Sequence, residues 1–272
     1  MKNKVDSKRF HFNWLLLTFW LFSMIILGFI VLPLIEMLLE QPIDMIIKAA
    51  QMPDITNSIL LSIEASLITS IIAVIFGTPL SYILARIEFP YKSIVEAIVN
   101  LPLAVPHTVA GIALLFVFGR SGPIGHITER FGISFWGTIF GIIVGMLFVS
   151  LPYMINSARL GFENVDIRIE KAARTLGATN RQVFFHISLP LAFRSILSGM
   201  VLTYARSIAE FGAVIILAYY PETAPVKIYE LFLTGGLKQS SAAAVLLLII
   251  TISTFIIFRY LTDFNRKGHK LK

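Results

Sequence analysis

Ionisable side chains within apolar runs are the residues of this chain best suited to chemistry. Arg206 and Glu210 stand four positions apart in such a run, so they would share one face of a helix. Charged groups are costly inside a bilayer, and those that occur there usually mark a route for ions or solutes. An ion pair that only holds a helix bundle together explains them equally well, and the sequence leaves both interpretations open.

A second group lies in the stretch 94–118, where Pro102 and Pro106 interrupt an apolar run and His107 and Thr108 follow. Prolines leave free carbonyls, which at membrane depth must face protein or a water-filled path. The pattern indicates a helix that lines a pore and moves at one end, with a kinked packing helix as the alternative. The candidate pathway residues are Pro102, Pro106, His107, Thr108, Arg206, Ser207 and Glu210.

Residues 163–190 form the one long polar interval of a mostly apolar sequence. Apolar side chains recur in its first half at helical spacing, which predicts a short helix with one apolar and one charged face. Asp166 is the expected N-cap, Gly177 the expected stop at positive φ, and Asn180 the expected cap of the next helix. Such a helix cannot cross a bilayer, so we expect it to lie at the membrane surface and present one side to a partner.

The composition indicates that these residues are positioned by membrane-spanning helices. The mean hydropathy is +0.80, and only 14% of the residues are charged, about half the share of a soluble domain. Runs of about 20 apolar residues are long enough to cross ~30 Å of hydrocarbon. We therefore expect one all-α transmembrane domain over residues 1–272, embedded in a lipid bilayer. The six expected spans are about 14–39, 56–85, 94–118, 134–156, 190–218 and 241–262.

The distribution of basic residues orients these spans. If both termini are cytoplasmic, few of the 23 Lys and Arg residues fall in the outer segments. Those few are Lys48, Arg120, Arg130, Lys227 and Lys238. Cytoplasmic loops carry the excess of basic residues, so the segment 159–190 is expected in the cytoplasm. The same skew explains the net charge of +7 without nucleic acid.

The polar interval also carries a motif with fixed spacing. Its residues are Lys171-Ala172-Ala173, then Gly177, then Ile187 and Leu189-Pro190. This spacing resembles the EAA signature of permease subunits of binding-protein-dependent ABC importers, with Lys171 in place of the usual Glu and Glu170 one position earlier. The resemblance implies that this segment holds a coupling helix that docks on an ATPase. The residues implied are Asp166, Glu170, Lys171, Ala172, Ala173, Leu176 and Gly177.

Two further stretches resemble permeases of the molybdate, tungstate and sulfate type. These are LPLAVPHTVAGIALL, from Leu101, and RSIAEFGAV, from Arg206. The resemblance implies a type I ABC importer permease in the cell membrane that forms a homodimer. It further implies two ABC ATPase subunits on the cytoplasmic side and an extracytoplasmic oxyanion-binding protein. The implied cargo is molybdate or tungstate, with sulfate or thiosulfate as the alternative.

Glu64 is a third charge expected inside the membrane. At 1.5 Å per residue, Arg206 lies roughly 24 Å from the inner end of its span and Glu64 roughly 12 Å from the outer end of its own. These depths are similar in a core of ~30 Å, so we expect Arg206 to meet Glu64 as well as Glu210. A bare arginine would hold a dianion too tightly for release. We therefore expect an internally neutralised group and not an open anion site.

Signatures of enzymes are missing from the sequence. It has no G-x-x-x-x-G-K-[ST] loop for ATP, no H-E-x-x-H or cysteine metal site, and no G-x-S-x-G elbow. We expect no enzymatic activity, cofactor or metal, so energy for uphill transport would come from a partner or an ion gradient. A stand-alone secondary transporter or channel is the second hypothesis. Secondary transporters usually contain internal repeats, whereas the polar interval has no counterpart elsewhere in the chain.

Overall fold

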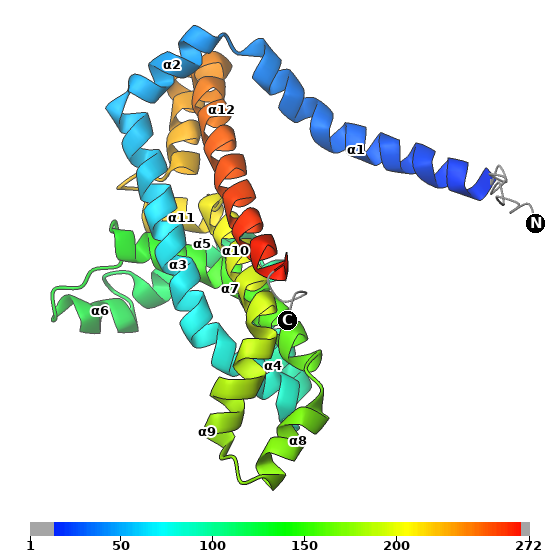
Figure 1. The fold of residues 1–272 in the computed structure, drawn as a ribbon. Coiled ribbons are helices and arrows are strands. Elements are labelled where there is room, and N and C mark those ends of the chain that lie inside the picture. Colours follow the sequence, from blue (N-terminus) through cyan, green and yellow to red (C-terminus); the bar gives the residue numbers. More distant parts are fainter. Residues whose placement is uncertain (1–13, 268–272) are drawn as a thin grey trace, which may run out of the picture.

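The computed structural model describes residues 14–267, with side chains to residue 257, and this part of the chain is helical apart from short connections (Figure 1). The longer helices are α1 (Trp14–Glu40), α3 (Pro53–Arg86), α7 (Ile139–Glu163), α10 (Leu189–Ile208) and α12 (Ala224–Lys267). The shorter helices are α2 (Ile43–Gln51), α4 (Lys92–Ala104), α5 (His107–Phe118), α6 (Pro123–Glu129), α8 (Ile167–Thr175), α9 (Asn180–Val183) and α11 (Gly212–Leu217). A π-helical turn, Phe184–Ser188, joins α9 to α10. The terminal basic residues used to orient the chain, such as Lys4 and Lys270, lie outside the described residues.

Within the described residues, five helices are long and apolar enough to cross a membrane. They are α1, α3, α7, α12 and the continuous run from α9 through α10. The helices α4 and α5 pass the same test only as a pair, bent by 114° at the break between them. Counted as one broken span, this pair brings the number to six, so the all-α membrane fold predicted from the sequence is confirmed.

The core forms where α3, α7 and α10 pack along one another (Figure 1). Small polar side chains line the buried face of α3, and Ser70 donates its hydroxyl to the carbonyl of Ser66 at 2.7 Å. Such a bond satisfies the hydroxyl within its own helix, and the small side chain lets the next helix approach closely. Ser81 Oγ lies 2.9 Å from the carbonyl oxygen of Ile155, which ties α3 to α7 directly.

Helix α1 extends from this core as a separate arm (Figure 1). None of its 27 residues is buried, and large side chains such as Trp20 and Phe29 are 71% and 75% exposed. An apolar surface of this extent needs lipid or a second protein chain to cover it.

The third span, predicted over 94–118 as a pore-lining helix or a kinked packing helix, is broken into α4 and α5. Pro106 has no N–H to donate, and a proline disfavours the helical conformation at the residue before it. Val105 is accordingly extended, with ψ of 130°, and separates α4 from α5. Pro102 lies within α4 and does not end it.

Two other spans, the fifth and the fourth, also differ from their expected bounds. The fifth, expected over 190–218, is interrupted between α10 and α11 at residues 209–211. The sixth, expected over 241–262, lies in the second of two helices that α12 joins across a kink at Gly236, where φ is 70°. The fourth begins at Ile139 and not near 134, because the chain turns at Gly137, where φ is 68°.

Candidate functional site

The first candidate site is a group of three side chains, His107, Arg206 and Glu210, called the charge cluster below. Arg206 Nη2 donates to Glu210 Oε2 at 2.8 Å. His107 Nδ1 lies 2.8 Å from the same carboxylate oxygen and 2.7 Å from Arg206 Nη2. Glu210 is only 1% exposed, whereas the side chains of Arg206 and His107 are 23% and 39% exposed. A buried carboxylate therefore has its charge balanced by Arg206 at the edge of the bundle.

The charge cluster lies where the two broken spans meet. His107 is the first residue of α5, and Glu210 lies in the break before α11. Glu210 Oε1 accepts a hydrogen bond from the Ala213 N–H at 2.9 Å, so the carboxylate also caps α11. The two helices approach closely, because a Cβ at Gly212 would stand 2.7 Å from His107 Cβ. Glycine at position 212 is thus a condition for this arrangement.

The remaining pathway candidates are distributed differently. Pro106 and Thr108 are exposed on either side of His107. Ser207 is fully buried and its Oγ donates to Ser150 Oγ at 3.0 Å, which makes it a contact between α10 and α7. Residues 106–108 therefore form the accessible part of the set, and Ser207 belongs to the packing of the core.

Glu64 does not join the charge cluster, which corrects the contact with Arg206 expected from depth. Its side chain is exposed on α3 and forms no ion pair with any residue that the structure describes. Ser62 and Ser66 on the same helix are fully buried. Because successive helical positions turn by about 100°, a residue midway between these two points away from the core.

The second candidate site is the helix pair α8 and α9 at the far end of the bundle from α2 (Figure 1). Asp166 caps α8 as predicted, accepting from the Arg168 N–H at 2.9 Å. The Arg168 guanidinium and N–H, which both bond to the Asp166 carboxylate, hold the pKa of that carboxyl below its usual value. Gly177 has φ of 90° and ends this helical segment as expected.

The cap predicted for α9 is wrong by one residue. Thr179, and not Asn180, is the N-cap, and Gln182 completes a capping box with it. The Thr179 hydroxyl accepts from the Gln182 N–H, and the Gln182 side chain accepts from the Thr179 N–H at 2.8 Å. Asn180 is the first residue inside the helix. The Thr-x-x-Gln pattern was the signal in the sequence that would have located the cap.

The residues implied in docking divide between two faces of α8. Lys171 and Ala172 are exposed, Ala173 is half-buried, and Leu176, just beyond the helix, is 88% exposed. Glu170 is instead 1% exposed and pairs with Arg86 at the end of α3. Sequence reasoning missed Arg86, although its place as the last residue of an apolar span was a signal.

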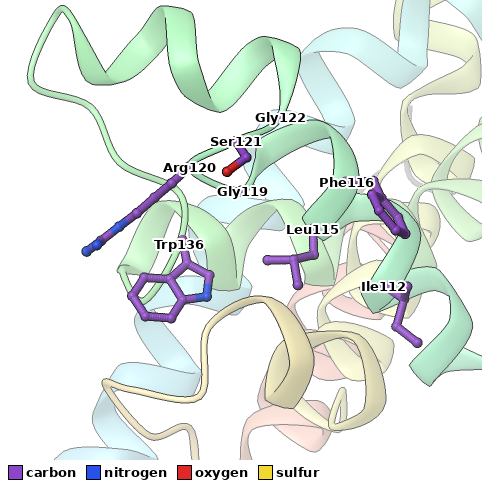
Figure 2. A pocket seen from close by; sticks show the side chains of 8 residues that line it. All are labelled: Ile112, Leu115, Phe116, Gly119, Arg120, Ser121, Gly122 and Trp136. Carbon is purple, nitrogen blue, oxygen red and sulfur yellow. The ribbon is translucent and has the colours of Figure 1, made fainter.

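One cavity adjoins the second candidate site, and another lies away from the charge cluster. The first lies between α8 and the segment that follows it, has a volume of about 450 Å³, and is lined by Ala173, Leu176, Gly177, Ala178, Gln182, His186 and Ile187. The second, about 370 Å³, lies at the end of α5 remote from His107. Figure 2 shows its apolar wall from α5, with Trp136 and Arg120 at one side. The Arg120 guanidinium lies 4.6 Å from the Trp136 ring centre.

Comparison with known proteins agrees with this architecture. A family model described as "Binding-protein-dependent transport system inner membrane component" matches residues 77–267. The "Molybdate/tungstate transport system permease protein WtpB" of Thermococcus kodakarensis is 41% identical over 249 residues, which cover 90% of this chain and 96% of that protein. The "Molybdenum transport system permease protein ModB" of Escherichia coli K12 is 36% identical, over 78% of this chain and 95% of that protein.

Solved structures show the same fold. A chain of a bacterial ABC transporter involved in the import of the polysaccharide alginate superposes with a TM-score of 0.74 at 18% identity, covering 92% of this chain and 95% of its own. A chain of the MetNI methionine ABC transporter gives a TM-score of 0.58 at 14% identity, over 80% and 98%. The resemblance inferred from the EAA-like spacing is confirmed. This chain belongs to the family of binding-protein-dependent transport system inner membrane components.

Proposed function

We propose that this chain is the membrane-spanning subunit of an ABC importer that carries molybdate or tungstate into the cytoplasm, driven by ATP hydrolysis on a separate subunit. One observation carries the mechanism: a capped helix, α8, stands at one end of an apolar bundle and exposes one face. This exposed face gives an ATPase a surface on which to act. The names of the relatives support the choice of cargo.

Docking of the ATPase is proposed at the exposed face of α8 and the adjoining 450 Å³ cavity. Ile169 is 48% exposed and Leu176 is 88% exposed, so both offer apolar surface to a partner. Lys171, Arg174 and Arg181 are exposed around them, which suits an acidic rim on the ATPase. In this arrangement α8 and α9 lie in the cytoplasm, as do both termini.

A homodimer is proposed because the accessible residues 106–108 lie at the surface of a single copy, so a pathway along them needs a second copy as its other wall. α1 buries none of its residues, and neither does α4. On α5, Val109 and Phe116 are 50% and 76% exposed, next to the exposed Thr108. We place the pathway between two copies, along the exposed faces of α4 and α5, with the binding protein docking at the opposite end from α8.

The charge cluster is proposed to set the geometry of that pathway without holding the anion. The Glu210 carboxylate balances the charge of Arg206 and caps α11, while His107 is the first residue of α5. A neutralised arginine attracts a passing dianion weakly enough for release. Movement of α4 about the break at Val105 would then open or close the route beside His107.

The test is reconstitution of the chain with its ATPase and binding protein in liposomes. Uptake of molybdate or tungstate that requires ATP inside the vesicles, the ATPase and the loaded binding protein supports the proposal. Stimulation by sulfate-loaded binding protein alone would replace the cargo with sulfate or thiosulfate. Uptake by this chain without the ATPase would refute the proposal in favour of a secondary transporter or channel.

A further inference from the structure

We infer that Glu170 is a positioning residue that locks α8 to the ends of α3 and α10, so that movement of α8 is passed to both spans. The inference rests on the proposed docking of an ATPase on α8. Of the nine residues of α8, Glu170 is the only buried one, with 1% of its surface exposed. Carboxylates are almost never fully buried unless they are paired. This side chain is therefore the main contact of the helix with the bundle.

One carboxylate oxygen joins three elements. Glu170 Oε1 accepts from Arg86 Nε at 2.9 Å and from Ser188 Oγ at 2.9 Å. Arg86 is the last residue of α3, and Ser188 is the last residue of the π-helical turn that leads into α10. The ends of both spans near α8 are thus bonded to the same oxygen atom of Glu170. Hydrogen bonds to an ionised group are shorter and stronger than neutral ones, which suits a rigid joint.

Arg86 holds α8 at a second point. Its Nη2 donates to the Val165 carbonyl oxygen at 2.8 Å, just before the helix begins. Val165 is 6% exposed and packs in an apolar cluster with Phe162 of α7 and Ala192 of α10. The guanidinium side chain is 9% exposed, so water competes little for either bond. Arg86 therefore controls both the start of α8 and its rotation.

The arrangement gives α8 one free face and one anchored face. A force applied by a partner at the exposed face has few routes into the bundle, because no other side chain of α8 is fully buried. Glu170 is the route with direct bonds to two spans. Arg174 approaches Glu170 Oε2 at 3.7 Å but is 42% exposed, so it screens the joint from outside. Loss of the joint should leave docking intact and weaken transmission.

The test compares uptake per ATP hydrolysed in the reconstituted full complex. Glu170→Gln keeps the shape and the acceptor for Ser188 but removes the charge that binds Arg86. We expect the ATPase to co-purify as with the parent and hydrolysis to continue, while uptake per ATP falls by about tenfold, as for a lost charge-assisted buried contact. Ser188→Ala should lower uptake per ATP by a smaller factor. The double variant Arg86→Gln with Glu170→Gln should lose no more than the more impaired of the two single variants.

Glu163→Gln is the matched control. It removes a carboxylate from an ion pair with Arg159 at the end of α7, where Glu163 is 37% exposed. Uptake per ATP should stay at the parental value in this variant. An equal fall in Glu163→Gln and Glu170→Gln would overturn the inference, because the effect would then be one of charge alone.

Other outcomes are equally decisive. Parental uptake per ATP in Glu170→Gln overturns the positioning role, and so does loss of ATPase co-purification, since Glu170 would then act in docking itself. If Glu170→Gln does not fold, an unchanged ratio in Ser188→Ala overturns it. Ala173→Trp, on the docking side, separates the two proposals. Normal assembly and uptake in Ala173→Trp refute docking on α8, whereas a defect there with normal Glu170→Gln refutes only the positioning role.

Discussion

Asn156 Nδ2 donates to Asn100 Oδ1 at 2.7 Å and thereby joins α7 to α4. Helix α4 buries none of its residues, so polar contacts carry much of its attachment. The second such contact is the ion pair of Arg159 with Glu96 at 2.9 Å. These two polar contacts therefore fasten this half of the broken span to α7.

Asn156→Leu should loosen α4. The substitution removes the donor to Asn100, and loss of one such hydrogen bond costs about 1 kcal/mol. We expect faster hydrogen exchange of the α4 amides in detergent, with exchange of the α3 core unchanged. Asn180→Ala, at an exposed position in α9, is the control. Equal exchange of α4 in the parent and in Asn156→Leu would show that the amide pair does not hold it.

Arg206→Leu should destabilise the protein strongly, because it leaves the buried Glu210 without its charge partner. Breaking a buried pair costs about 3–5 kcal/mol, and the partial exposure of Arg206 puts the expectation near the lower value. Adding Glu210→Gln should recover part of the loss. Melting temperatures in detergent measure both effects.

Glu64→Gln provides the matched control for the charge cluster. Since Glu64 lies outside the cluster, its effect should add to that of Arg206→Leu without coupling. If the effects of Glu64→Gln and Arg206→Leu on stability are not additive, the contact between Glu64 and Arg206 expected from their depth exists, which contradicts the structure. Normal stability of Arg206→Leu together with abolished uptake would instead favour direct contact of the anion with Arg206.

Gly177→Val should impair ATPase association through the backbone alone. Gly177 has φ of 90°, and a Cβ there would meet no atom within 4 Å. The left-handed region costs residues with a side chain about 1–2 kcal/mol. Gly132, with φ of 76° and equally open surroundings, is the control. Both valine variants should lower the melting temperature, but only Gly177→Val should reduce co-purification of the ATPase.

Single cysteines can report the topology, because the chain has none of its own. Thr175 at the end of α8 and Ser121 near the far end of α5 are both exposed. Thr175→Cys should react with a membrane-impermeant maleimide only from the cytoplasm, and Ser121→Cys only from outside. Labelling of both from the same side would refute the proposed orientation.

The Asp166 cap should act independently of pH near neutrality. Since its folded pKa is lowered, its stabilising contribution is fully present above the unfolded value of about 3.9 and is lost as pH falls through the lower folded value. Asp166→Ala should weaken ATPase binding by the same factor from about pH 6 to pH 8. A loss that varied across this range would point to another titrating group.

The sequence by itself determined the features that depend on local chemistry. Apolar length located the spans, Asp166 and Gly177 bounded α8, and the spacing through Pro190 identified the family. Each of these follows from hydrophobicity or backbone preference within a few residues. The N-cap of α9 was predicted at Asn180, but a capping box with Gln182 begins one residue earlier, at Thr179. This cap is also a local feature of the sequence.

Only the tertiary structure decided which way each helix faces. The rise along a helix placed Arg206 and Glu64 at similar depth, but packing of α3 turned Glu64 outward and the break before α11 brought Glu210 to His107. Packing likewise turned Glu170 inward to Arg86. Rotation about a helix axis is set by contacts between residues far apart in the chain, which a local pattern does not encode.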